Sequence, residues 1–419
     1  MTAKHRILTL AHGHPDHTMG GAEVAARDLF LAYRDREDVE DAWLLARANL
    51  GAGPRGRISN LRENEFLWEQ SLSDLFFMRA QNRHEVTGYF TEFLQFLRPT
   101  IVHSHHYFQL GLEHLRAIKR ADPSIVTLLT LHEYLAICPN MGLMKSPHGK
   151  PCRSGRYFDH IACNPETSPE ALWLRKHRFE RYFDFVDLFV APSSFLMERY
   201  VEWGIVRQRI VVIENGQPGT PVRGREELDE KRIRNRFGFF GQINEHKGLD
   251  VVLRGLASLS ETQRQSIVLE VNGANLERQS RALQRTVQEL AAPLMREGVL
   301  RWRGPYERAE LDDRMASVDW VIVPSTWYEN SPLVIQEAYA RGRPVIASDI
   351  GALREKVRHG VWGHLLPPGD AQAWARHIVK VAGDSALWDK LAVQLPTPPG
   401  ISEAAEACLS AAVSAGAAR

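Results

Sequence analysis

Two glutamates, Glu329 and Glu337, stand eight positions apart in a stretch that could bind a polar ligand. The apolar run Val318–Val323 before them is typical of a buried parallel strand. The segment Pro332–Arg341 then indicates a helix, because proline suits the first helical turn. We therefore expect Glu329 in the loop before the helix, and Glu337 about one and a half turns into it.

The start of this helix is a potential anion site. The first backbone N–H groups of a helix have no partner inside it, so they attract phosphates. The two carboxylates add acceptors for hydroxyl groups. N–H groups that donate to a phosphate, beside carboxylates that accept from hydroxyl groups, suit a sugar nucleotide. We assign its binding to the residues around the helix start: Asn330, Ser331, Leu333, Val334 and Glu337.

Other segments complete a pattern that runs from about residue 6 to residue 385. Six segments, in this order, resemble the retaining glycosyltransferases of family 4: Gly20–Glu23, Leu131–Glu133, Phe239–Gly248, the Glu-x7-Glu stretch Glu329–Glu337, Arg343–Glu355 and Gly363–Asp370. Two glutamates at this spacing occur by chance on many helices. Six matches in the family's order are a strong signal.

The resemblance implies a fold and an activity. The fold is GT-B, an α/β architecture of two Rossmann-like, doubly wound domains that face each other across a cleft. The activity is transfer of a hexosyl unit from a UDP- or GDP-linked sugar to a hydroxyl acceptor, with retention of anomeric configuration and without a cofactor or a bound metal ion. Such enzymes usually assemble polysaccharides or glycolipids, so the expected acceptor is a saccharide or a lipid-linked saccharide.

Length and composition fit this expectation. The 419 residues suit two domains, and 44% hydrophobic and 25% charged residues are ordinary for a globular protein. The formal charge of +1 gives no global field that would favour nucleic acid. The first residues lack the apolar stretch of a signal peptide, and we find no apolar run of spanning length. With four cysteines, this indicates a cytoplasmic protein with free thiols.

Strand-like and helix-like runs alternate in both halves, which indicates parallel α/β layers. The helix-like run Ala22–Arg34 carries one apolar stripe. The expected strands are Arg6–Ala11, Ala42–Ala46, Ile101–Ser104, Ile125–Leu131, Leu188–Ala191, Arg236–Phe240, Ile267–Asn272, Leu300–Arg303, Val318–Val323 and Pro344–Ser348.

A stretch rich in Gly, Pro and charge lies between the halves and predicts a linker. We place an acceptor-side domain at residues 1–213, the linker at 214–232 and a donor-binding domain at 233–385. A tail at 386–419 follows, and the resemblance implies that it crosses back to the first domain.

Lys247 follows a strand-like run and a polar loop, where its ammonium could neutralise a diphosphate leaving group. The family often carries an arginine five residues earlier. Here that position is Gln242, which can donate a hydrogen bond but carries no charge. The missing cation could come from Arg303 or Arg354. The resemblance assigns Glu329 to the donor sugar or the reacting carbon, so the expected catalytic residues are Glu329, Lys247 and His132.

Gly20 and Gly21 precede a helix, where glycine would let the backbone approach a donor phosphate closely. A simple turn is the plainer interpretation. His14 and Asp16 lie in the same loop, among residues that could also bind a metal ion. The resemblance favours a polar loop that faces the acceptor.

His132 is expected at the carboxyl end of a strand, the edge where ligands bind in open α/β sheets. The resemblance implies that it reaches the donor sugar. The family's following Asp is Glu133 here, which is one methylene longer. His105 lies at another such edge and is a candidate for acceptor contact.

Two further clusters have competing interpretations. The cysteines Cys138, Cys152 and Cys163 could bind a structural zinc, but their gaps exceed zinc-knuckle spacing, so free thiols are favoured. The segment 172–183 has an apolar face and many cations. It suits peripheral contact with an anionic membrane, contact with a phosphate-bearing acceptor, or an ordinary solvated helix.

Two alternative functions remain open from the sequence. A nucleotide-sugar epimerase uses the same architecture and would turn over donor without an acceptor. A non-catalytic scaffold would bind the sugar nucleotide and transfer nothing. The complete Glu-x7-Glu pair and Lys247 argue against the scaffold, whereas Gln242 leaves it open.

Overall fold

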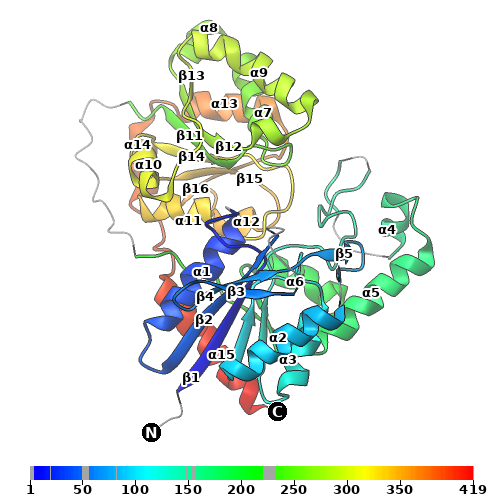
Figure 1. Cartoon of the computed structure of the whole chain (residues 1–419). Coiled ribbons are helices and arrows are strands. Elements are labelled where there is room, and N and C mark those ends of the chain that lie inside the picture. The colour runs from blue at the N-terminus through cyan, green and yellow to red at the C-terminus, as the bar shows by residue number, and fades with distance from the viewer. Residues whose placement is uncertain are drawn as a thin grey trace. The chain divides into compact units, whose positions relative to one another are not determined.

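The computed structural model describes residues 4–18, 20–49, 56–81, 83–147, 149–152, 157–219 and 233–418. The chain divides into two compact α/β units (Figure 1). Unit 1 comprises Met1–Pro218 and Pro399–Arg419, and unit 2 comprises Gly219–Pro398. Most of the predicted linker lies outside the described residues. No helix among the described residues is long and apolar enough to cross a membrane.

Unit 1 is built on one large sheet. Its strands are β1 (His5–Ala11), β2 (Val39–Ala48), β3 (Ile58–Arg62), β4 (Glu65–Glu69), β7 (Ile101–Ser104), β8 (Val126–Thr130), β9 (Leu188–Ala191) and β10 (Ile210–Val212). They lie in the order β10-β9-β8-β7-β1-β2-β4-β3, and only β3 is antiparallel to its neighbour. The short strands β5 (Leu72–Asp74) and β6 (Arg79–Ala80) form a separate pair.

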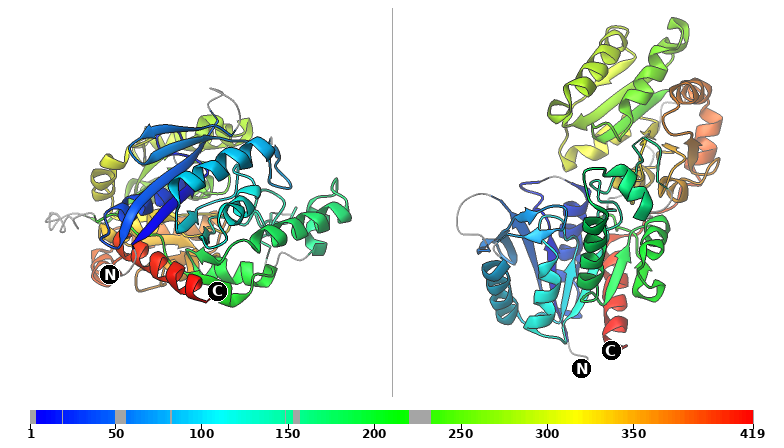
Figure 2. Two further views of the ribbon diagram at one scale, coloured as in Figure 1. Left: turned by 60° about the horizontal axis from the view of Figure 1, so that its bottom comes forward. Right: turned by 90° about the vertical axis from the view of Figure 1, so that its right-hand side faces the viewer.

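Helices cover both faces of this sheet. On one face, α1 (Gly21–Arg34) and α15 (Ile401–Ala417) bury Leu29, Phe30 and Leu409. On the other, α2 (Arg83–Leu97) and α3 (Glu113–Ala121) bury Phe90 and Ile118. The remaining helices of unit 1 are α4 (Tyr157–Cys163), α5 (Pro169–Phe183), α6 (Ser194–Trp203) and the 3-10 turn η1 (Arg207–Arg209) (Figure 2).

Unit 2 has a fully parallel sheet. Its strands are β11 (Arg236–Gln242), β12 (Val268–Ala274), β13 (Leu300–Trp302), β14 (Trp320–Val323), β15 (Val345–Ser348) and β16 (Gly363–Leu366), in the order β13-β12-β11-β14-β15-β16. The order reverses between β11 and β14. In doubly wound sheets, ligands bind beyond the carboxyl ends of the strands at such a reversal.

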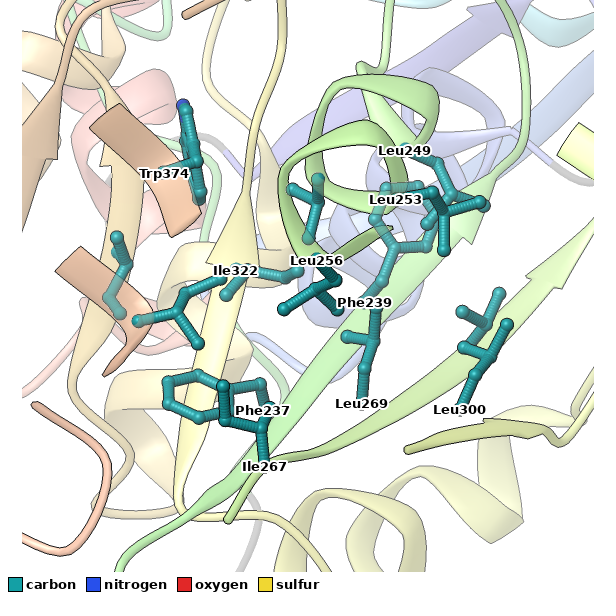
Figure 3. Close-up of a cluster of buried hydrophobic side chains, with 14 of the residues drawn as sticks. Phe237, Phe239, Leu249, Leu253, Leu256, Ile267, Leu269, Leu300, Ile322 and Trp374 are labelled. Atoms are coloured by element: carbon teal, nitrogen blue, oxygen red, sulfur yellow. The ribbon is translucent and has the colours of Figure 1, made fainter. Parts of the chain in front are cut away.

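The helices of unit 2 also lie on both faces of its sheet. One core joins β11 and β12 to α7 (Leu249–Ala257), α9 (Arg281–Arg296), α13 (Ala371–Val381) and α14 (Ser385–Ala392), and Figure 3 shows part of it. The opposite core joins β14 and β15 to α10 (Leu311–Ala316), α11 (Leu333–Ala340) and α12 (Leu353–Lys356). Short turns complete the unit: α8 (Glu261–Gln265), η2 (Leu276–Arg278) and η3 (Arg308–Glu310).

The prediction of two α/β units with parallel sheets is confirmed, and every predicted strand is present with small shifts at its ends. One assignment was wrong. We placed residues from 386 onward in the tail, but Trp388 and Leu391 of α14 belong to the core of unit 2. Their apolar side chains have the spacing of a helix that packs on the preceding α13, and only the residues from Pro399 onward return to unit 1.

Candidate active site

Two loops meet where the strand order of unit 2 reverses. One follows β11 and carries Lys247, and the other follows β14 and carries Glu329. The backbone N–H of Thr326 donates to the carbonyl of His246 at 2.8 Å. Gly248 has a φ of 70°, and a Cβ there would collide with the carbonyl oxygen of Pro324. Glycine therefore allows the contact that holds the two loops together.

Glu329 is the buried centre of this contact. Its Oε1 accepts hydrogen bonds from Lys247 Nζ at 2.8 Å, Ser325 Oγ at 2.6 Å and Trp327 Nε1 at 3.0 Å. Burial raises the pKa of the Glu329 carboxyl, but Lys247 and the other two donors outweigh it and leave the pKa below its usual value. Glu329 is thus a carboxylate that forms an ion pair with Lys247.

Aromatic and turn contacts hold the pair in place. The Trp327 ring stacks on His246, with centroids 5.1 Å apart and planes 19° apart. Asn244 Oδ1 accepts from the backbone N–H groups of His246 at 2.9 Å and Lys247 at 3.1 Å. We did not predict roles for Ser325, Trp327 or His246 from the sequence. Their positions relative to Glu329 depend on the meeting of two loops.

Helix α11 begins at Leu333 with Pro332 as its N-cap, one residue later than predicted. Ser331 just before it is buried, and its Oγ has no hydrogen-bond partner among the described residues. Asn330, Leu333 and Val334 are partly buried around the same helix start. Glu337 is partly exposed. It lies close enough to Tyr306 to raise that phenol's pKa, an effect second to burial.

The cations that could replace the family's missing arginine are engaged elsewhere. Gln242 is exposed at the carboxyl end of β11. Arg354 donates to both carboxylate oxygens of Asp349, at 2.6 Å and 3.0 Å. Arg303 Nε lies 3.9 Å from a carboxylate oxygen of the buried Glu270. The carboxylate contacts of these two arginines do not involve the loop that carries Lys247.

A groove of about 680 Å³ opens at the same edge of the unit 2 sheet. The segments that follow β11, β12 and β13 form one side of it, and α9 forms the other. Its lining is mainly apolar and includes Ile243, Gly273, Val287, Ala291, Trp302 and Pro305. This volume lies within the range of small-molecule sites. We predicted no groove at this place from the sequence.

In unit 1, histidines gather beyond the carboxyl ends of three adjacent strands. His12 follows β1, His105 and His106 follow β7, and His132 follows β8 by two residues. His105 Nδ1 lies 3.1 Å from His132 Nε2. Burial lowers the pKa of His132 to about 3 and that of His105 far below its usual value, with neighbouring histidines adding to both shifts. These two rings are therefore neutral.

His12 forms a second pair in this cluster. Its Nε2 lies 3.2 Å from Oε1 of the buried Glu23, and its ring centroid is 4.4 Å from that of His106. Burial raises the pKa of Glu23, but the bond from His12 outweighs this effect and lowers it. The buried Nδ1 of His12 has no hydrogen-bond partner among the described residues. We named Glu23 only as part of a glycine-rich loop.

The glycine-rich loop itself is fixed by carboxylates. A Cβ at Gly20 would overlap Oε2 of Glu23, so this glycine makes room for that carboxylate; Gly21 follows as the first residue of α1. His14 is fully buried, with Nε2 2.7 Å from Oε2 of Glu65. Asp16 forms an ion pair with Arg62. These contacts give His14 and Asp16 a role in holding the loop.

Buried cations occupy part of the basic segment 172–183. Arg175 is only 4% exposed, and it donates to the carbonyls of Phe76 and Ala136, each at 2.9 Å, and to that of Leu135. Arg178 Nη2 lies 2.7 Å from a carboxylate oxygen of Glu113. These two cations stabilise the fold of unit 1. Lys176 and Arg181 are exposed on the same helix.

Glu133 lies in the loop that Arg175 holds. Burial raises the pKa of its carboxyl to about 8, although Tyr107 and Arg175 act in the opposite direction. This carboxyl therefore carries a proton at neutral pH.

The cysteines do not form a metal centre among the described residues, where no group of three or more His, Cys, Asp or Glu side chains could hold an ion. Cys138 Sγ contacts the carbonyl of Asn140 at 3.8 Å, and Cys163 Sγ contacts that of Lys145 at 3.9 Å. Cys138, Cys152 and Cys163 form no disulfide among the described residues. The nearby His148 lies outside the described residues.

Comparison with known families agrees with this arrangement. A model described as "Glycosyltransferase Family 4" matches residues 19–217, and one described as "Glycosyl transferases group 1" matches residues 234–384. Together they cover most of the chain.

Known relatives and solved structures show the same likeness. A D-inositol 3-phosphate glycosyltransferase of Thermobispora bispora is 30% identical over 216 residues, which are 49% of this chain and 50% of that protein. The chain thus matches about half the length of such relatives. The fold resembles Anabaena HepE in complex with UDP and glucose (TM-score 0.64, 18% identity, 98% and 100% of the two chains). It also resembles the lipopolysaccharide outer core galactosyltransferase WaaB (TM-score 0.62, 17% identity, 97% and 99% of the two chains).

Proposed function

Since the chain belongs to glycosyltransferase family 4 and has the GT-B fold, we propose that it is a retaining hexosyltransferase. It moves a hexosyl unit from a UDP- or GDP-linked sugar to a hydroxyl acceptor. The observation that carries the proposal is the Lys247–Glu329 pair, which lies at the strand reversal of unit 2 beside the start of α11. A cation, a helix start and a buried carboxylate at this place suit a diphosphate joined to a sugar.

The roles of the donor-site residues follow from their chemistry. Lys247 and the helix start at Ser331 and Leu333 bind the diphosphate, and Glu337 accepts the ribose hydroxyls. Glu329 faces the sugar. In a retaining transfer the acceptor attacks from the face that the diphosphate leaves, so the leaving phosphate can take the acceptor's proton. Lys247 stabilises the negative charge that develops on that phosphate.

Unit 1 supplies the acceptor side in this proposal. Its strand edge presents the neutral rings of His105 and His132 and the Nδ1 of His12, which can form hydrogen bonds with hydroxyl groups. The relatives are named for D-inositol 3-phosphate. For this chain we propose a saccharide or lipid-linked saccharide hydroxyl, in polysaccharide or glycolipid assembly. His132 is proposed to reach the donor sugar as well.

A peripheral membrane contact is a further part of the proposal. Trp173 and Leu174 on α5 are each 52% exposed, beside the exposed cations Lys176 and Arg181. Exposed tryptophan with lysine or arginine suits the surface of an anionic bilayer. Arg175 and Arg178 do not contribute to this surface, because the fold uses both of them.

The alternative function is a non-catalytic scaffold that binds a sugar nucleotide. The observation that favours it is Gln242, together with the carboxylate contacts of Arg303 and Arg354. Because Arg303 and Arg354 have carboxylate partners, Lys247 is the one cation among these residues that we assign to the diphosphate. A scaffold would bind nucleotide and turn over no donor with any acceptor.

Titration calorimetry with UDP and with GDP tests the donor site. The wild type should bind one of the two nucleotides. Glu337→Ala should weaken that binding about ten-fold or more, because a hydrogen bond to a charged group contributes about 1.5–3 kcal/mol. Glu289→Ala removes an exposed carboxylate from α9 and is the matched control. Binding of neither nucleotide, or binding that is indifferent to Glu337, would contradict the donor-site assignment.

A further inference from the structure

The cation that we assign to the donor diphosphate already has a partner. Lys247 Nζ lies 2.8 Å from Oε1 of Glu329, and their side chains are 28% and 8% exposed. Salt screens a partly buried pair less than a surface pair. Glu329 is therefore a substantial competitor for the ammonium group of Lys247.

The two partners of this pair differ in their freedom to move. Ser325 Oγ and Trp327 Nε1 donate to the same oxygen of Glu329, and Trp327 in turn stacks on His246. The Glu329 carboxylate is thus anchored from its own loop. Lys247 carries its charge on a flexible four-carbon stem. The ammonium group is the partner that can turn toward a ligand.

We propose that Glu329 competes with the donor diphosphate for Lys247, so that this carboxylate sets the affinity of the site below the value that its cation could give. The inference rests on the proposed donor site. It adds a role for Glu329 besides contact with the sugar, and it names Ser325 and Trp327 as positioning residues that keep the carboxylate in place.

The competition has a use in turnover. A nucleoside diphosphate that stays bound after transfer blocks the next donor, and product release often limits the rate of well-evolved enzymes. When the product leaves, the ammonium group of Lys247 returns to Glu329 and is not left without a partner. The carboxylate therefore lowers the barrier to release and raises the dissociation constant of the nucleotide.

The test compares nucleotide affinity in two charge-matched variants. Glu329→Gln removes the competing charge and keeps the side-chain size. Glu245→Gln removes one negative charge from the same loop as Lys247, where that side chain is exposed and contacts His246. Calorimetry should show that Glu329→Gln binds UDP, or GDP if that is the ligand, about three- to tenfold more tightly than the wild type. Glu245→Gln should stay within about twofold of the wild type.

The matching nucleoside is the second probe. Uridine or guanosine lacks the diphosphate, so its affinity should not change in Glu329→Gln. Unchanged or weaker binding of the diphosphate by Glu329→Gln would overturn the inference, and so would an equal gain for the nucleoside. If this variant fails to fold, Glu329→Asp withdraws the carboxylate by one methylene and should tighten diphosphate binding at least about twofold; no gain would overturn the inference.

The outcome for the wild type separates this inference from the proposed function. A wild type that binds neither UDP nor GDP contradicts the donor site itself. A wild type that binds one of them, and whose affinity falls in Glu337→Ala, keeps the donor site. In that case the affinity of Glu329→Gln for the nucleoside diphosphate decides whether Glu329 competes for Lys247.

Discussion

Gly20 illustrates how one atom decides a local structure. Its φ of −144° is open to any residue, so the requirement for glycine is spatial. The space that a Cβ would fill is taken by the Glu23 carboxylate, which pairs with His12. The glycine therefore makes room for an internal carboxylate. The role at a donor phosphate that we expect for it from the sequence stays a prediction.

Gly20→Ala should destabilise the protein by about 1–3 kcal/mol, because the new methyl group displaces a buried carboxylate from its partner. Urea unfolding measures the change. Gly88→Ala is the control, since a Cβ at that helical position meets no atom within 4 Å. Alanine there should be neutral or stabilise by up to about 1 kcal/mol. Equal effects at the two positions would contradict this account.

The buried histidines of unit 1 should make the protein less stable in acid. Burial lowers the pKa of His103 and His132 to about 3 and that of His114 to about 4. Below the unfolded value of about 6.5 the unfolded chain binds protons that the folded one does not, so stability falls as pH falls. Each such histidine should lower the free energy of unfolding by about 2 kcal/mol between pH 6.5 and pH 5.

Glu133 acts in the opposite direction over this whole range. Its carboxyl has a pKa of about 8, so its contribution to stability is present at low pH and is lost as pH rises through that value. The stabilising effect of this one carboxyl is smaller than the combined effect of several histidines, so the protein should still be less stable at pH 5 than at pH 6.5. Urea unfolding at pH 6.5 and pH 5 checks the sign, and greater stability at pH 5 would contradict it.

At the scale of elements, α5 tethers two loops of unit 1 through one buried guanidinium. Arg175 donates to carbonyls of the segment that follows β8 and to Phe76 near β5. The segment after β8 also carries His132 and Glu133. The helix thereby fixes the edge where we place the acceptor, so its packing and the geometry of the histidine cluster depend on each other.

Arg175→Met should lower the free energy of unfolding by about 3–5 kcal/mol, because several buried carbonyls lose their donor at once. Lys176→Met is the neighbouring control. Its side chain is 45% exposed, and its change should stay within about 1 kcal/mol. A similar small loss for both variants would show that the contacts of Arg175 contribute little.

Apolar runs of the central strands were readable from the sequence, because strands buried on both faces need them. The edge strand β3 was not, since its residues are partly or fully exposed and include Ser59, Asn60 and Arg62. Glu329, Glu337 and Lys247 were found by type and spacing. The ion pair between Glu329 and Lys247 and the Trp327–His246 stack were not, because they join loops about 80 residues apart.

At the scale of the whole molecule, the return of the chain completes unit 1. The backbone of Gln217 bonds to the returning chain. Its N–H donates to the carbonyl of Pro399 at 2.9 Å, and its carbonyl accepts from the N–H of Ile401 at 2.8 Å. Helix α15 then packs on α1, β8 and β9. The resemblance implied this return, whereas the small side chains of the many alanines in this helix give only a weak apolar pattern.

Deletion of residues 399–419 should expose the apolar face that α15 covers, including Leu29 and Phe30. Hydrogen exchange should then lose protection in α1, β8 and β9, whereas the core of unit 2 around Phe237 should keep it. Alanine replacement of the exposed Glu406 on α15 is the control and should leave exchange unchanged. Equal loss in both units would mean that their stabilities are coupled.

The path of the chain through both units also affects the order in which they can fold during synthesis. Unit 2 is continuous in sequence, so all of its strands and helices have been synthesised before α15 exists. Unit 1 starts first but must wait for its last helix, and meanwhile the sheet face that α15 will cover is bare. Nascent chains in such a state are prone to aggregate. The first-made half of this protein is therefore the last to mature, and it is the half for which a chaperone would matter most.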